Sequence, residues 1–194
     1  IRQKNAAVLT QKLKAALINL NFLTVEFDIA VRPGQTITAK GYDDVEFLIS
    51  TNPGESLKPL SQVASGGELS RIMLAIKTVL AGRDEIDTLI FDEIDTGISG
   101  RTAWKVAEQL SVLSGAHQVI CITHLPQIAA MADVHFVIEK SSTDDMTITD
   151  IRKVADKESL AELARLLGSD ALTEAALSNA KEMKEQANAF KEVR

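Results

Sequence analysis

The sequence predicts an α/β fold in which helices cover a mostly parallel sheet. From Gly67 onward, stretches with helical apolar periodicity alternate with short apolar runs that are typical of buried strands. Such alternation requires right-handed crossovers between parallel neighbours. The chain has 194 residues, of which 45% are hydrophobic and 25% are charged, so it can bury one full core with a small appended element.

A helix is expected over residues 1–20, where apolar side chains recur at three- and four-residue steps. These are Leu9, Leu13, Ala16, Leu17 and Leu20. No capping residue opens the helix, which suits the tail of a longer helix such as one strand of a coiled coil. The start at Ile1, without a signal segment, fits a piece of a longer protein.

A small β segment should follow, because residues 25–29 alternate apolar and charged side chains and residues 45–49 partly repeat this pattern. Pro33-Gly34 and Gly41 mark the expected turns. The remaining elements follow in order: a helix after Gly67, strands at 87–92, 118–123 and 134–139, helices near 101–114 and from 126, a final edge strand at 146–152, and helices at 157–167 and 171–192.

Charge and composition exclude several classes of protein. The net charge of −6 argues against a surface that is basic all over, so any contact with nucleic acid is local or lies elsewhere in the parent protein. Residues 1–25 are basic and lack acids, which indicates a solvated helix face, with a DNA-binding stretch as the alternative interpretation. Cys121 lies in an apolar run, as expected of a core residue in a reducing cytoplasm. No stretch reaches the roughly 20 apolar residues that a membrane span needs.

The segment Ser65-Gly66-Gly67-Glu68 has two compatible interpretations. Ser65 followed three residues later by Glu68 is a capping box, in which the glycines only shape the turn. Two consecutive glycines also leave the helix N-terminus bare of side chains, so that its N–H groups and the positive end of its dipole can meet a phosphate.

Two acids, Asp92 and Glu93, end an apolar run that should be a strand buried on both faces. In α/β sheets, ligands bind at the carboxyl ends of the strands. Asp92 can hold Mg²⁺, commonly through water, and Glu93 can accept a proton from an attacking water. The alternative is a pair of solvated acids without a ligand. His124 ends the next strand, where an imidazole could donate to a γ-phosphate.

No GxxxxGK[ST] loop occurs to cradle the α- and β-phosphates of a nucleotide. We therefore expect the isolated chain to bind ATP poorly and to be inactive.

Taken together, the segments 64–68, 89–93 and 122–124 resemble the signature motif, the Walker B motif and the switch histidine of ABC-type ATPases, in the same order and spacing. More narrowly, the segments 63–71, 91–100 and 123–127 resemble the bacterial RecN family of SMC-like proteins of DNA double-strand-break repair. This similarity extends from about Phe22 to Gly168.

The resemblance implies the C-terminal lobe of an ABC/SMC-type P-loop ATPase head. Two such heads would sandwich two ATP molecules, with Mg²⁺. Ser65, Gly66 and Gly67, with Glu68, would contact the γ-phosphate held by the partner head. Asp92 would be the metal ligand, Glu93 the general base and His124 the γ-phosphate sensor. Ser99 stands where the D-loop usually carries an aspartate, and Glu68 replaces the glutamine of transporters.

The resemblance also implies three segments: 1–21 as the end of a returning coiled-coil helix, 22–170 as the lobe, and 171–194 as a C-terminal helix. The expected partners are the N-terminal lobe of the same protein, a second head, and DNA through the full-length protein. No membrane partner is expected, and the location would be the cytoplasm, on the nucleoid. Two alternatives remain: an ATPase subunit of an ABC transporter, and a non-catalytic interaction module.

Overall fold

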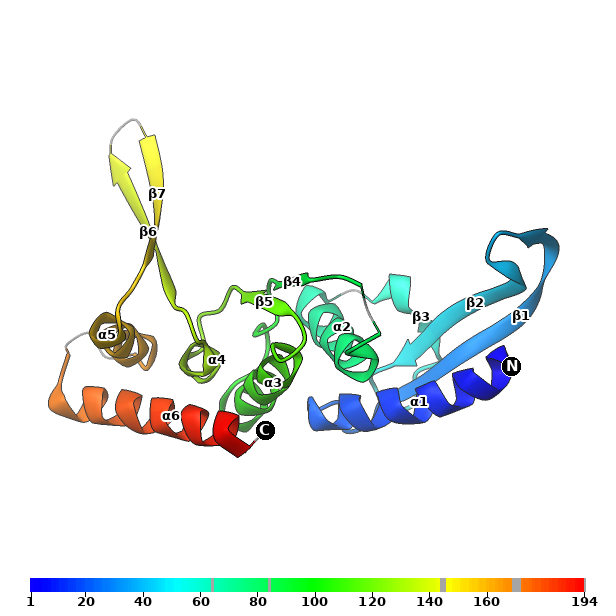
Figure 1. Ribbon diagram of the computed structural model, residues 1–194, viewed down its shortest axis with the longest axis horizontal. Coiled ribbons are helices and arrows are strands. Elements are labelled where there is room, and N and C mark those ends of the chain that lie inside the picture. Colours follow the sequence, from blue (N-terminus) through cyan, green and yellow to red (C-terminus); the bar gives the residue numbers. More distant parts are fainter. Residues whose placement is uncertain (64, 84, 144–145, 169–171, 194) are drawn as a thin grey trace. The chain divides into compact units, whose positions relative to one another are not determined.

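The computed structural model describes residues 1–63, 65–83, 85–143, 146–168 and 172–193 (Figure 1). It divides the chain into two compact units. The first comprises Ile1–Gly97 and Val112–Ile122, and the second comprises Ile98–Ser111 and Thr123–Arg194. The expected boundary between residues 170 and 171 lies outside the described residues, so the three-segment division stays a prediction.

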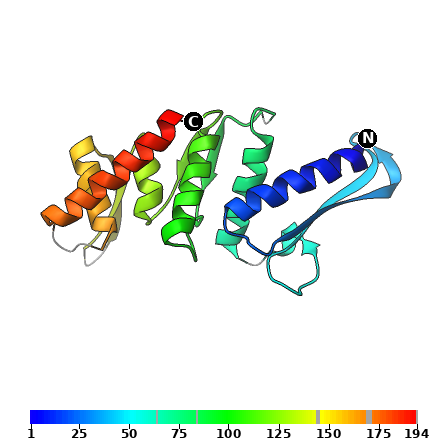
Figure 2. The same ribbon diagram turned by 90° about the horizontal axis from the view of Figure 1, so that it is seen from below.

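The first unit begins with helix α1 (Arg2–Asn19), which confirms the helix expected over residues 1–20. It packs against an antiparallel sheet of order β1-β2-β3, formed by β1 (Glu26–Thr38), β2 (Gly41–Ser50) and β3 (Lys58–Pro59). Leu13, Leu17 and Leu20 are buried, because the apolar stripe of α1 faces the sheet. The helix runs along the β1–β2 hairpin (Figures 1 and 2).

The turn expected at Pro33-Gly34 is wrong, since both residues lie within β1. The pairing of β1 with β2 only shifts register between Pro33 and Thr38, and the chain reverses at Gly41, where φ is +103°. Proline has no N–H to give to a strand ladder and therefore suits such an irregularity. A Cβ at Gly34 would collide with the carbonyl oxygen of Tyr42, so this glycine permits close approach of the strands.

Beyond the short helix η1 (Leu60–Gln62), helix α2 (Gly66–Leu80) leads to β4 (Thr88–Phe91) and β5 (Gln118–Cys121). These two strands pair in parallel, with Phe91 opposite Cys121. Leu89 and Phe91 are buried, whereas Ile90 is 67% exposed. The apolar run of β4 is therefore buried on one face only, which corrects the expectation of a strand buried on both faces.

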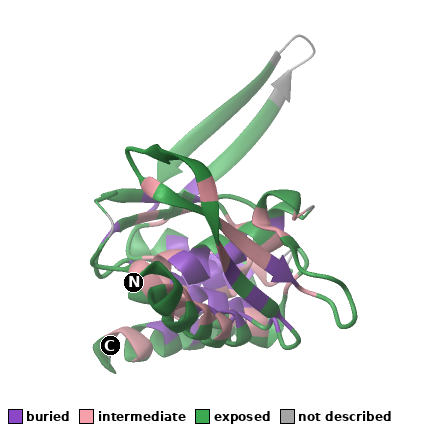
Figure 3. Ribbon diagram, turned by 90° about the vertical axis from the view of Figure 1, so that its right-hand side faces the viewer, coloured by how far each residue is buried: buried purple, intermediate pink, exposed green. Residues whose placement is uncertain are grey.

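The second unit contains most of α3 (Gly100–Leu113), then α4 (Pro126–Met131), β6 (Phe136–Thr143), β7 (Met146–Lys153), α5 (Asp156–Leu166) and α6 (Glu174–Val193). The strand expected near residues 146–152 is confirmed as β7, but it forms an antiparallel hairpin with β6. Within the described residues, the expectation of a mostly parallel sheet holds only for β4 and β5, although the α/β class is confirmed. The β6–β7 hairpin is exposed along most of its length (Figure 3).

Helix α6 packs on α4 and α5 (Figures 1 and 2). Its buried positions are Ala180, Met183 and Ala187. Lys184 Nζ donates to the carbonyl oxygens of Ala130 at 3.0 Å and Ala132 at 2.7 Å, at the end of α4. Burial, followed by the charge of Lys191, lowers the pKa of Lys184. The ammonium group satisfies carbonyls that a helix end leaves without partners, and its charge suits the negative end of the helix dipole.

Replacing Lys184 with methionine should therefore lower the free energy of unfolding by about 2 kcal/mol, because charge-assisted hydrogen bonds are lost and two carbonyls are left without a donor. Urea denaturation of this chain measures the change. Lys181→Met is the matched control, since Lys181 is exposed on the same helix and only approaches Glu185 at 3.8 Å. Equal stability of the two variants would contradict the role given to Lys184.

Among the described residues, no helix combines the length and the apolar character needed to span a membrane.

Candidate functional site

The N-terminus of α2 is built as its sequence predicts. Ser65 is the N-cap residue, and its Oγ accepts a hydrogen bond from the N–H of Glu68 at 3.4 Å. Gly66 and Gly67 form the start of the helix, and Glu68 places a carboxylate in its first turn. Ala64, the first residue of the predicted motif, lies outside the described residues. The cap is confirmed, while phosphate binding at this end stays a prediction.

The two acids, Asp92 and Glu93, directly follow β4, and both are exposed. Glu93 has φ of +57°, which is a left-handed conformation that few non-glycine residues adopt. Its N–H donates to Oδ1 of Asp92 at 2.9 Å. Strained backbone of this kind persists only where neighbouring groups hold it.

Those neighbours come from α2. Ser70 Oγ donates to the carbonyl oxygen of Asp92 at 2.8 Å. Arg71 Nη1 donates to the carbonyl oxygen of Thr96 at 2.9 Å and, more weakly, to that of Ile94 at 3.4 Å. The segment after β4 forms a turn, in which the Thr96 N–H donates to the Glu93 carbonyl at 3.0 Å. The predicted signature and Walker B segments therefore meet within the first unit.

The close packing gives the two glycines a structural role that was not evident from the sequence. A Cβ at Gly67 would lie 2.9 Å from the Glu93 carbonyl oxygen and 2.9 Å from Cβ of Thr96, which is closer than real Cβ atoms come. A Cβ at Gly66 would collide with Oε2 of Glu93. Because the atoms met at Gly67 include backbone, a bare α-carbon is needed at this position for the 93–96 segment to lie against the helix, whether or not a phosphate binds. At Gly66 the atom met is the end of a flexible side chain.

Arg71 is a site residue that sequence reasoning missed. Its guanidinium is buried, and Cζ lies 5.5 Å from the centre of the Phe22 ring. Burial lowers the pKa of Arg71, and the nearby Glu68 carboxylate partly offsets this. An arginine remains charged under such conditions. The only available signal was a cation on the otherwise apolar side of α2.

At the end of β5, Cys121 is partly buried. Burial first, and then the charges of Asp95 and Asp92, raise the pKa of the Cys121 thiol to about 12. Since a thiol reacts as the thiolate, this one is inert near neutral pH. The thiol is therefore unreactive, as expected of a core cysteine, although the side chain is only partly buried.

The remaining predicted residues, Ser99 and His124, belong to the second unit. The Ser99 carbonyl accepts from the N–H of Thr102 at 3.2 Å and so supports the first turn of α3. His124 follows β5 in the chain, next to a turn in which Thr123 Oγ1 accepts from the Leu125 N–H at 3.0 Å. The structure brings Ser65, Gly66, Gly67, Glu68, Asp92 and Glu93 together in the first unit. The roles given to these residues stay predictions, as do those of Ser99 and His124.

This arrangement fits part of a magnesium–nucleotide site. Asp92 has one carboxylate oxygen engaged by the Glu93 N–H, and its group is of the hard oxygen type that Mg²⁺ prefers. The first-turn N–H groups of a 15-residue helix lie beside these acids and favour an anion such as a phosphate.

The fold defines a class of protein. Solved structures that resemble the chain include the Smc head domain with a coiled coil and joint from Pyrococcus yayanosii, with TM-score 0.58 and 19% identity over 84% of this chain and 29% of that one. Another is the Smc head domain from Pyrococcus furiosus bound to the C-terminal domain of ScpA, with TM-score 0.54 and 19% identity over 86% of this chain and 39% of that one. The chain thus has the fold of part of an SMC-type head.

The particular relatives are RecN proteins. The chain is 42% identical to DNA repair protein RecN of Halalkalibacterium halodurans over 98% of its length, and 48% identical to that of Bacillus subtilis over 80% of its length. It spans 34% and 27% of these two relatives, respectively. No family model matches the chain. The resemblance to RecN is confirmed, and the chain corresponds to about a third of such a protein.

Proposed function

We propose that this chain is the C-terminal lobe of the ATPase head of an SMC-like protein that acts in DNA double-strand-break repair. ATP would join two heads, and hydrolysis would release them, on DNA bound by the full-length protein in the cytoplasm. One observation carries the proposal: the first unit holds both a helix that starts at two glycines and a strand that ends in the acids Asp92 and Glu93. The similarity to RecN supports it.

In the engaged state, the N-terminus of α2 would meet the γ-phosphate of the ATP held by the partner head. Ser65, Gly66 and Gly67 would supply hydroxyl and N–H donors, beside the carboxylate of Glu68. Ser99 would make the D-loop contact across the two heads. His124 would sense the γ-phosphate of the nucleotide held by its own head through an imidazole donor.

The hydrolytic step would depend on Glu93. Its carboxylate would take a proton from a water molecule as the water oxygen forms a bond to the γ-phosphorus. The bond to the β–γ bridging oxygen would break, and the products would be ADP and phosphate. Asp92 would hold Mg²⁺, which neutralises charge on the phosphate oxygens when bound.

A lobe that lacks a P-loop needs a second part of the protein. Ile90 on β4 pairs with Ile120 on β5, and Ile122 directly follows β5. The three side chains are 67%, 45% and 47% exposed and form an apolar face. Exposed contiguous apolar surface of this kind marks an interaction site. Because the relatives are about three times as long as this chain, we assign this face to the N-terminal lobe of the same protein, which would also supply the P-loop.

The proposal is tested by measuring ATP hydrolysis by this chain alone and by an equimolar mixture with the N-terminal lobe. We expect no activity alone and hydrolysis on mixing. Ile90→Asp should abolish the gain on mixing, because it places a charge on the assigned face. Ile37→Asp is the matched control, since Ile37 is 84% exposed on the β1–β2 hairpin. Robust hydrolysis by the chain alone, or equal loss in both variants, would contradict the proposal.

A further inference from the structure

A buried cation on α2 holds the segment that carries the acids. The guanidinium of Arg71 is part of a side chain that is only 8% exposed. Burying a charge is costly unless its donors are taken up. Here the donors go to backbone carbonyls of Thr96 and Ile94, and the Phe22 ring lies against the same group. An apolar side chain would fill the same space without holding these carbonyls.

The carbonyls held by α2 lie on both sides of Glu93 in the chain. Ser70 donates a hydrogen bond to the carbonyl of Asp92, which precedes Glu93. Arg71 donates to the carbonyls of Ile94 and Thr96, which follow it. Between these anchors Glu93 keeps its φ of +57°. A left-handed backbone conformation is strained for a residue other than glycine, so this conformation depends on the anchors. The backbone conformation of Glu93 in turn decides where its carboxylate points.

We propose that Arg71 is a positioning residue for Glu93. It orients the Glu93 carboxylate by fixing the backbone segment that follows the glutamate. This inference rests on the proposed role of Glu93 as general base. The contacts described for Arg71 are with two backbone carbonyls and with the Phe22 ring, so it would act on the reaction only through the segment that it holds. Its removal should therefore slow the chemical step while leaving the binding of ATP and the association of heads in place.

The test uses the full-length parent protein, in which kcat and KM for ATP are measured per folded molecule. Arg71→Met should lower kcat by about tenfold or more, because small misplacements of a reacting group are that costly. KM should change by no more than about twofold, since the contacts that bind ATP in the ground state are unchanged. Arg71→Lys should recover part of kcat, because one ammonium group can reach one carbonyl but lacks the fork that spans two.

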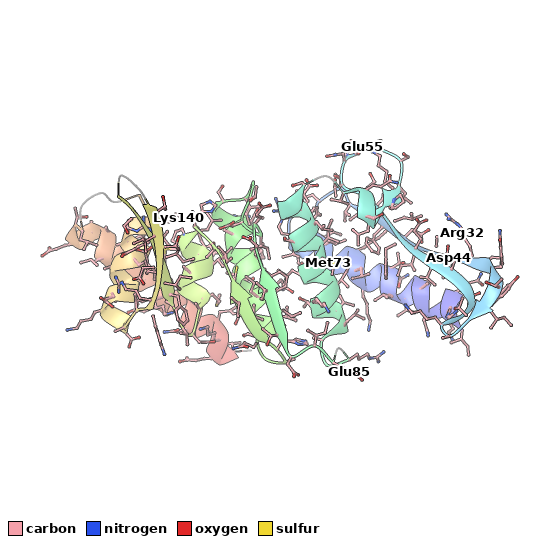
Figure 4. The ribbon with its side chains drawn as sticks, turned by 90° about the horizontal axis from the view of Figure 1, so that it is seen from above. Arg32, Asp44, Glu55, Met73, Glu85 and Lys140 are labelled. Carbon is pink, nitrogen blue, oxygen red and sulfur yellow. The ribbon has the colours of Figure 1, made fainter. Side chains whose placement is uncertain are left out.

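Arg32→Met is the control, since Arg32 lies on the β1–β2 hairpin, pairs at 3.3 Å with Glu46 and is exposed (Figure 4). It should keep the wild-type kcat. If Arg71→Met does not fold, the test rests on Arg71→Lys. A kcat below that of the wild type, with the same free energy of unfolding as the wild type, would support the proposal. If the Arg71 variants keep the wild-type kcat while Glu93→Gln is inactive, only the inference about Arg71 is overturned. Full turnover by Glu93→Gln would instead overturn the proposed function.

Discussion

Glu93→Gln in the full-length protein is expected to abolish ATP turnover while preserving ATP-dependent association of heads. The amide cannot take a proton from water, and loss of a general base typically lowers a rate by about 10²–10⁴-fold. The substitution hardly changes size. Because Glu93 is exposed and its N–H donates to Asp92 through the backbone, the hydrogen bond that shapes the segment is retained.

Steady-state hydrolysis and size-exclusion chromatography with and without ATP measure the two effects. Glu85→Gln is a suitable control, since Glu85 is also exposed and lies outside the site (Figure 4). Undiminished hydrolysis by Glu93→Gln would contradict the role of this carboxylate as general base. Loss of association together with loss of hydrolysis would show that Glu93 binds rather than reacts.

Gly67→Ala is expected to have the second largest effect, on stability as well as activity. The added methyl group would meet backbone atoms, namely the carbonyl oxygens of Glu93 at 2.9 Å and Thr96 at 3.0 Å. Backbone cannot move aside as a side chain does, so we expect a loss of about 1–3 kcal/mol in the free energy of unfolding. The segment carrying Glu93 would also separate from α2, and hydrolysis by the full-length protein should fall.

Gly66→Ala is the matched comparison. Its methyl group would meet the carboxylate end of Glu93, which is flexible and can swing away. Its unfolding free energy should therefore stay near that of the wild type, helped by the better helix propensity of alanine. Urea denaturation of both variants of this chain measures the difference. Equal destabilisation by the two substitutions would show that close approach to the backbone is not what requires glycine at position 67.

The elements best predicted from the sequence are those decided by near neighbours. Ser65 and Glu68 are three residues apart, and their capping contact forms as expected. Apolar periodicity predicts both ends of α1 and α5, and the start of α2, to within a residue or two. Gly168 follows the end of α5, with φ of +84°. The parallel pairing of β4 with β5 also agrees with the expected fold class.

The misses concern contacts that periodicity does not encode. A strand pattern indicates extended chain but not its partner. The sequence predicts one mostly parallel sheet with an edge strand at residues 146–152, whereas β6 and β7 form a separate antiparallel pair. An apolar run predicts burial, but Ile90 is exposed in the part of the chain that the structure describes. Pro33-Gly34 was read as a turn, since the same residues serve turns and strand irregularities.

Four features could be read from the sequence: the α/β class, the capped start of α2, the acids that end β4 and the resemblance to RecN. All of these depend on residue type and short spacing along the chain. Two further features became visible only in the folded chain: Arg71 and Ser70 hold the segment around Glu93, and Gly67 must lack a side chain. The reason is physical: the hydrogen bond from Ser70 joins residues 22 positions apart, and that from Arg71 to Thr96 joins residues 25 apart. Such pairs meet only when α2 and β4 pack.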